Sequence, residues 1–225
     1  ATMHLFGLIT FGRLQTTVQT KESREQSFRS SISEYLHELR TNPVMWRLTA
    51  VASAVEIFGF SFATALPELA SNTLNVGAEG LGYLHGARSV GGLLAGLALA
   101  WAGTLHRTGF TFIGVVIGFG VALLALGASP SLVFALTGVA LVAGCASSCD
   151  ILVQTMLQTC VPDHLRGRAM GAWVLALGAG PIGHLQVGAL AAVFGAGVTL
   201  MANGGVLILL GVLTAVSVPA IRKMR

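Results

Sequence analysis

Between Arg107 and Asp150 no residue carries a formal charge, and most residues are apolar. Soluble domains contain about 25% charged residues, and a water-soluble globule has no means of covering so long an apolar run. One membrane-spanning helix needs about 20 apolar residues, so this run is too long for a single span. The turn-forming sequence GASP interrupts it at residues 127–130. We therefore predict two transmembrane helices, at about residues 108–126 and 131–155.

The composition of the whole chain agrees with a membrane protein. Only 10% of the residues are charged, 54% are hydrophobic, and the mean hydropathy is +0.78. The remaining apolar segments predict four further spans, at about residues 44–69, 80–103, 169–194 and 198–220. The expected fold is an all-α membrane protein, with a six-helix transmembrane bundle over residues 44–221 and a short tail at 222–225.

The basic residues indicate which side of the membrane each loop faces. The loops around residues 70–79, 127–130 and 195–197 contain no lysine or arginine. Basic residues gather in cytoplasmic loops, so the polar segment before the first span, the 104–109 and 161–168 loops and the C-terminus are predicted to be cytoplasmic. The residues on that side are Arg13, Lys21, Arg24, Arg29, Arg40, Arg47, Arg107, Arg166, Arg168, Arg222, Lys223 and Arg225.

The N-terminal part of the chain is divided into a short apolar piece and a polar segment. Residues 1–12 are too few to span a bilayer and lack a basic start or a cleavage site. We expect them to be the end of a transmembrane helix whose beginning is absent from this sequence. Residues 13–43 are polar, and apolar residues at helical spacing in their second half predict an amphipathic helix. Asn42 and Pro43 are a suitable N-cap and first-turn residue for the following span.

A charged island with the sequence VPDHLRGRAMG separates two apolar runs at residues 161–171. Arginine is costly in hydrocarbon, so the island must lie in water or among lipid headgroups. Pro162 ends the preceding helix, and Asp163 is suited to the start of the next one. The motif resembles the cytoplasmic loop between helices 10 and 11 of major facilitator superfamily transporters, in the drug and siderophore exporter branch. This resemblance implies that the chain corresponds to the C-terminal half of such an exporter, with residues 13–43 as the linker between halves.

A second loop, AGTLHRTG at residues 102–109, is similar to the G-x-L-A-D-R-x-G motif of the same superfamily. Arg107 and Gly109 match that motif, whereas His106 replaces its aspartate. The resemblance implies that the two loops gate the conformational change. A short basic turn without a gating role is the alternative for residues 102–109. The candidate gating residues are His106, Arg107, Gly109, Asp163, Arg166, Gly167 and Arg168.

Ionisable residues inside the predicted spans are candidates for transport, because each costs about 2.5–3.5 kcal/mol to insert. Glu56 lies near mid-depth in the first span. It either carries a proton or contacts a cationic substrate, or it forms a structural hydrogen bond. Arg88 and His85 share one face of the second span. Arg88 either binds an anionic group, pairs with Glu56 or extends toward the outer surface.

The fourth and fifth spans carry further polar candidates. Asp150 and Gln154 belong to a polar stripe that either lines a water-filled cavity or forms interhelical hydrogen bonds. His184 either relays protons or packs against a neighbour, and it follows Gly180, Pro181 and Gly183. Proline inside a helix removes a hydrogen bond and predicts a kink at these three residues. The sequence Gly92-x-x-x-Gly96 in the second span predicts close helix packing.

No catalytic set, metal-ligand cluster, cofactor motif or nucleic-acid motif is visible in the sequence, and the cysteines are interpreted as packing residues. We expect an integral protein of a bacterial inner membrane rather than an enzyme. Its predicted partners are the lipid bilayer, a small-molecule substrate, protons, and an N-terminal half or a second copy. The predicted function is secondary active efflux by proton antiport. A non-transporting membrane scaffold, or a remnant of a transporter, is the alternative.

Overall fold

A computed structural model describes residues 42–103, 107–163 and 166–222, without the side chains of residues 168 and 220. Every regular element in these residues is helical. The apolar piece at 1–12, nearly all of the linker at 13–43, and His106 lie outside the described residues. Asn42 confirms the predicted N-cap, because its side-chain oxygen accepts hydrogen bonds from the backbone N–H groups of Val44 and Met45, each at 3.1 Å.

The first predicted span is a broken helix. It consists of α3 (Pro43–Phe58), the 3₁₀ segment η1 (Phe60–Ala65), one turn α4 (Leu66–Glu68) and the π segment η2 (Leu69–Thr73). The break comes at Gly59, where a Cβ atom would lie 2.7 Å from Cε1 of Phe119. Phe60 packs edge-on against the same ring, with centroids 6.0 Å apart. The close approach of Phe119 therefore accompanies the change of helix type at this point.

The remaining elements are mostly long helices. They are α5 (Gly77–Ala102), α6 (Thr108–Gly127), α7 (Leu132–Thr159), α8 (Arg166–Leu177), α9 (Gly180–Phe194), α10 (Ala196–Ser217) and the short α11 (Pro219–Arg222). The fifth predicted span is interrupted between Leu177 and Gly180, and Pro181 lies in the first turn of α9. Proline is favourable there because its missing N–H has no partner in a first turn.

Five helical segments in the described part of the chain are long and apolar enough to cross a membrane. They are Pro43–Thr73, Thr108–Gly127, Leu132–Thr159, Ala169–Phe194 and Ala196–Ser217. The sixth predicted span falls on α5, whose 26 residues would extend over roughly 39 Å. Charged residues and glycines make α5 less apolar than the others, so the count of six spans stays a prediction. Large apolar side chains are exposed on the helices, with Trp101 at 94% and Leu185 at 75%, as expected for surfaces in contact with lipid.

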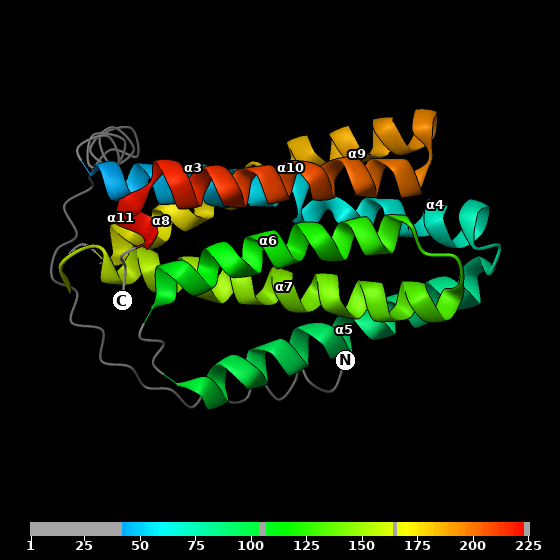
Figure 1. Ribbon diagram of the computed structural model, residues 1–225, viewed down its shortest axis with the longest axis horizontal. Helices are drawn as coiled ribbons and strands as arrows, with labels where there is room; N and C mark the ends of the chain where they lie inside the picture. The colour runs from blue at the N-terminus through cyan, green and yellow to red at the C-terminus, as the bar shows by residue number, and fades with distance from the viewer. Residues whose placement is uncertain (1–41, 104–106, 164–165, 223–225) are drawn as a thin grey trace, which may run out of the picture. The chain divides into compact units, whose positions relative to one another are not determined.

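The helices α10, α6, α7 and α5 contact one another in that order (Figure 1). α8 packs against α3 and α7, while α9 packs against η1, α3 and α10. The core holds fully buried aromatic and aliphatic side chains, among them Met45, Leu48, Phe62, Phe112, Phe119, Leu123, Leu126 and Met156.

Glycines spaced seven residues apart allow α6 and α10 to approach closely. A Cβ atom at Gly204 would lie 2.6 Å from the Gly120 carbonyl oxygen, and one at Gly120 would lie 2.5 Å from the Gly204 oxygen. The same relation holds at Gly127 and Gly197, with 2.5 and 2.7 Å. Such close backbone contact is typical of membrane helices that pack through small residues. In the Gly92-x-x-x-Gly96 sequence, Gly92 contacts Ser147 of α7, whereas Gly96 faces open space.

Candidate functional site

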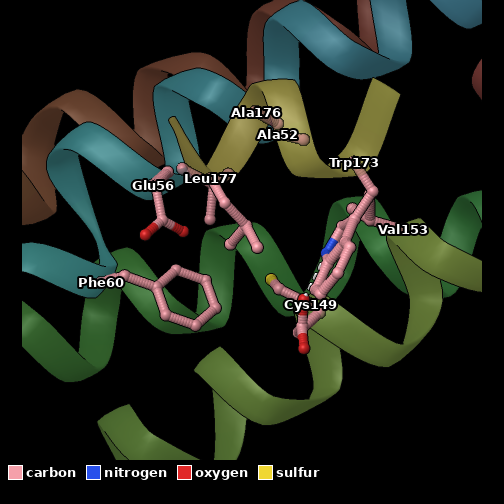
Figure 2. Close-up of a pocket in the computed structure, with 10 residues that line it drawn as sticks. Ala52, Glu56, Phe60, Cys149, Val153, Trp173, Ala176 and Leu177 are labelled. Carbon is pink, nitrogen blue, oxygen red and sulfur yellow. Dashed lines mark hydrogen bonds between the residues drawn. The ribbon is translucent and has the colours of Figure 1, made fainter. Parts of the chain in front are cut away.

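Three helices, α3, α7 and α8, surround a small pocket (Figure 2). It lies where η1 begins, so Phe60 contributes to its wall beside residues of α3. Its polar side chains are Glu56 and Asp150, and its aromatic side chains are Phe60 and Trp173. The other lining residues are small or apolar: Ala52, Val55, Cys149, Val153, Ala176 and Leu177. The pocket therefore holds two acidic side chains and no basic one.

Asp150 is held in place by hydrogen bonds to both carboxylate oxygens. The indole Nε1 of Trp173 in α8 donates to Oδ1 at 2.7 Å, and the amide Nε2 of Gln154 donates to Oδ2 at 3.1 Å. Gln158, one turn further along α7, donates to the sulfur of Met170 in α8. The polar stripe of α7 is thus turned toward α8, where it makes interhelical bonds and also borders the pocket. The two donors fix the orientation of the Asp150 carboxylate.

Glu56 has a different environment. No hydrogen bond reaches its carboxylate from any residue that the structure describes. It lies beside Gly180, where a Cβ atom would be 3.1 Å from Oε1 of Glu56. The next turn of α9 is equally tight, because Gly183 faces the backbone of Ile57. The glycines of the predicted kink region therefore let the start of α9 approach α3 next to Glu56.

Arg88 and His85 are both exposed on α5, away from the pocket lining. The Arg88 guanidinium carbon lies 5.5 Å from the centroid of the Phe62 ring, a cation–π contact. The one ion pair among the described residues joins Arg166 to Asp163, at 2.9 Å. Glu56 and Arg88 do not form the ion pair that was left open from the sequence.

His184 is joined to the first span instead of to the pocket. Its Nδ1 lies 2.8 Å from the hydroxyl of Thr64 in η1. Gly188, one turn along α9, is also close to Thr64, because a Cβ there would lie 3.9 Å from the Thr64 methyl carbon. Glu56 and Thr64 are two helical turns apart along the first span. Because α9 contacts both residues, it lies along one side of α3 and η1.

A buried amide pair links α9 to α10. Gln186 donates from Nε2 to Oδ1 of Asn203 at 3.0 Å, and Asn203 is 2% exposed. The second amide atoms, Gln186 Oε1 and Asn203 Nδ2, are buried without a hydrogen-bond partner in the described residues. Sequence reasoning noted neither Asn203 nor the roles of Phe60, Thr64 and Trp173. Of these four residues, only Asn203 could have been noticed in the sequence, because it is a polar residue within an apolar span.

The candidate gating loops are described in part. Asp163 and Arg166 form an exposed pair, with side chains 88% and 55% accessible, at the start of α8. Gly109 is buried in the first turn of α6, and Gly167 is exposed. Burial raises the pKa of the Cys160 thiol at the end of α7, so this cysteine should react slowly with thiol reagents. Within the described ranges, no three His, Cys, Asp or Glu residues are grouped as metal ligands would be.

Glu68 is a further residue that sequence reasoning passed over. Its Oε2 accepts a hydrogen bond from the backbone N–H of Ala196 at 2.6 Å, so a carboxylate from the first span caps the N-terminus of α10. A negative charge there interacts favourably with the helix dipole. Glu68→Gln should lower the free energy of unfolding by about 1–2 kcal/mol. Thermal unfolding in detergent, compared with the unmodified protein, measures this. Unchanged stability of Glu68→Gln would contradict the capping role.

Comparison with known proteins shows that the chain is similar to exporters. It is 34% identical to the multidrug efflux pump Tap of Mycolicibacterium fortuitum over 145 residues, which are 64% of this chain and 35% of Tap. It is 27% identical to the enterobactin exporter EntS of Shigella flexneri over 188 residues, which are 83% of this chain and 44% of EntS. The matched residues thus cover less than half the length of each relative. No family model matches, and no solved structure matches. The relatives confirm the resemblance to major facilitator exporters, and with the apolar helices they identify an integral membrane protein.

Proposed function

We propose that this chain is the C-terminal half of a secondary active exporter that exchanges a small molecule for protons across a bacterial inner membrane. The observation that carries the proposal is the pair Glu56 and Asp150, which face one pocket within the spans and have no basic residue beside them. Ionisable groups at such depth are retained where ions or substrates pass. Both named relatives are exporters, which supports the direction of transport.

In this proposal the bundle works together with an N-terminal half. Alternating access rocks one half against the other around a site near the midplane. The breaks at Gly59 and before Gly180 adjoin the pocket, and broken helices are the usual positions of transporter sites and hinges. Arg166 and Arg168 lie in the first turn of α8, before the pocket residues of that helix, so we assign them to conformational cycling rather than to substrate affinity.

The test uses inside-out membrane vesicles that contain the complete transporter, with both halves. Export then appears as uptake into the vesicle, and a panel of fluorescent drugs of differing charge serves as the probe. Uptake of at least one drug should require an acidic lumen and should stop when a protonophore removes the gradient. Uptake that continues after the gradient collapses would contradict proton exchange. Vesicles that take up no drug would favour the non-transporting scaffold.

The orientation of the chain is a separate prediction, based on the positions of the basic residues. In a background without the native cysteines, Asn72→Cys should react with a membrane-impermeant maleimide added to intact cells, and Gly167→Cys should not. Both positions are exposed, and a Cβ at Gly167 meets nothing within 4 Å, so neither change should disturb the fold. After the cells are opened, Gly167→Cys should react as well. Labelling of Gly167→Cys from outside would refute this orientation.

A further inference from the structure

We infer that Gln186 of α9 and Asn203 of α10 form a joint that favours separation of these two helices, because the closed pair leaves one hydrogen-bond donor and one acceptor unsatisfied. The inference goes beyond the proposed function and rests on it only where the separation is assigned to the transport cycle. The two side chains share one hydrogen bond of 3.0 Å. Gln186 Oε1 and Asn203 Nδ2 are buried away from water and have no partner among the described residues.

The shortage of partners does not depend on which way round each amide group is placed. Each amide offers one carbonyl oxygen and one NH₂ group. If both groups were turned over, Asn203 Nδ2 would donate to Gln186 Oε1, and the other oxygen and nitrogen would be left over. If one group were turned over, two like atoms would face each other and the bond would be lost. In this arrangement of the helices the pair therefore buries unsatisfied polar atoms, which is unfavourable within a membrane span.

The two neighbours of α10 are attached to it in different ways. The glycines of α10 that meet another helix face α6, and they are Gly197, Gly204 and Gly211. A Cβ atom at these positions would lie 2.7, 2.6 and 2.5 Å from the closest α6 atom. The glycines of α9 that meet another element face the first span instead, and they are Gly180, Gly183 and Gly188. The α6–α10 contact is therefore a close backbone seam, whereas α9 meets α10 through side chains.

The surroundings of α9 leave room for such a separation. In Figure 1 this helix lies at the upper margin of the bundle, beside α10. The span that contains it, Ala169–Phe194, is 28% buried over its apolar window, compared with 39–50% for the other four apolar spans in the described part of the chain. The chain bends at both ends of α9, at the break before Gly180 and at Gly195, whose φ is +83°. A segment with little buried area and a bend at each end is the kind that opens locally.

Separation of α9 from α10 supplies the missing partners. Once the helices part, water reaches both amides and can bond to Gln186 Oε1 and Asn203 Nδ2, so the open arrangement no longer carries unsatisfied atoms. The bond between His184 and Thr64 still joins α9 to η1, so we expect these two segments to move together. In the proposed transport cycle, this movement is one step of the conformational change, and the amide pair makes it easier by destabilising the closed contact.

The experiment replaces both amides by apolar side chains of similar size, Gln186→Met and Asn203→Leu, in the purified complete transporter in detergent. The double variant loses the unsatisfied atoms together with the bond, so its unfolding temperature should rise by at least about 2 °C. Each single variant leaves an amide without any partner and should unfold at a lower temperature. Deuterium exchange of the α9 backbone amides should be at least about tenfold slower in the double variant, because α9 opens less often. Gln154→Met is the matched control, since it removes a bond to Asp150 and should lower the unfolding temperature.

A double variant that unfolds at or below the temperature of the unmodified protein would overturn the inference, because the pair would then stabilise the closed contact. Unchanged exchange in α9 would overturn it as well. If the variants fail to fold, the unmodified protein decides: its α9 amides should exchange faster than those of α10, and equal protection would refute the joint. Unfolding and exchange are read without a gradient, so a failure of proton-driven export leaves these results intact. Drug uptake into vesicles should be slower with the folded double variant, and unchanged uptake would refute the assignment to the transport cycle.

Discussion

Glu56→Gln should abolish proton-driven export while leaving the protein folded and inserted. Glutamine has nearly the same shape as glutamate but cannot take up or release a proton at this position. Glu56 loses no hydrogen bond within the described residues, and it lies beside Gly180 of α9, so stability should change by less than about 1 kcal/mol. Transport coupled to the gradient should fall by a factor on the order of 100, as when a proton-transferring side chain is removed. Uptake into inside-out vesicles measures it.

Arg88 provides the critical comparison for this result. If Glu56 and Arg88 formed an ion pair, Glu56→Gln would leave an uncompensated buried charge, and Arg88→Gln would partly rescue the double variant. The guanidinium lies over Phe62 instead, so the two substitutions should have independent and additive effects on thermal stability. Glu79→Gln should export normally. Undiminished pH-dependent export by Glu56→Gln would end the assignment of this residue as the proton carrier.

Features that depend on local sequence were predictable. The charge-free run and its GASP interruption predicted helices at 108–126 and 131–155, and the structure has α6 at Thr108–Gly127 and α7 at Leu132–Thr159. Asn42 could be identified as a cap because capping depends on the next three residues alone. Pro181 marked the region in which one predicted span becomes α8 and α9, since proline restricts the backbone wherever it occurs.

Features that depend on which helix faces which were not predictable from one sequence. The spacing of residues along a helix indicates their depth in the membrane and which of them share a face. It does not indicate which other helix packs against that face. Asp150 was therefore recognised without Trp173, which donates to it from α8. The change to a 3₁₀ segment after Gly59 comes beside Phe119 of α6, which sequence reasoning had no means of placing there. Arg88 was given Glu56 as a possible partner on depth alone, whereas Phe62 lies under it.

Gly204→Leu should cause the largest loss of stability among the substitutions considered. A Cβ atom at this position would lie 2.6 Å from the Gly120 oxygen and 3.0 Å from the backbone nitrogen of Leu124. Both contacts are with backbone, so no flexible side chain can move aside, and α6 and α10 must separate. Overpacking of this kind costs about 1–3 kcal/mol or more. Gly204→Ala should show the same sign with a smaller loss, because it adds the Cβ alone.

Gly205, the next residue along α10, provides a control variant whose expected effect on stability has the opposite sign. Gly205 faces away from α6, and a Cβ there meets nothing within 4 Å. Alanine is better than glycine inside a helix by about 0.5–1 kcal/mol, so Gly205→Ala should be neutral or stabilising. The two alanine variants differ by one residue in position, so composition and helix propensity are matched and only the facing helix differs. The temperature of unfolding in detergent distinguishes them. If Gly204→Ala were as stable as Gly205→Ala, the close approach of α6 and α10 would not exist in the membrane protein.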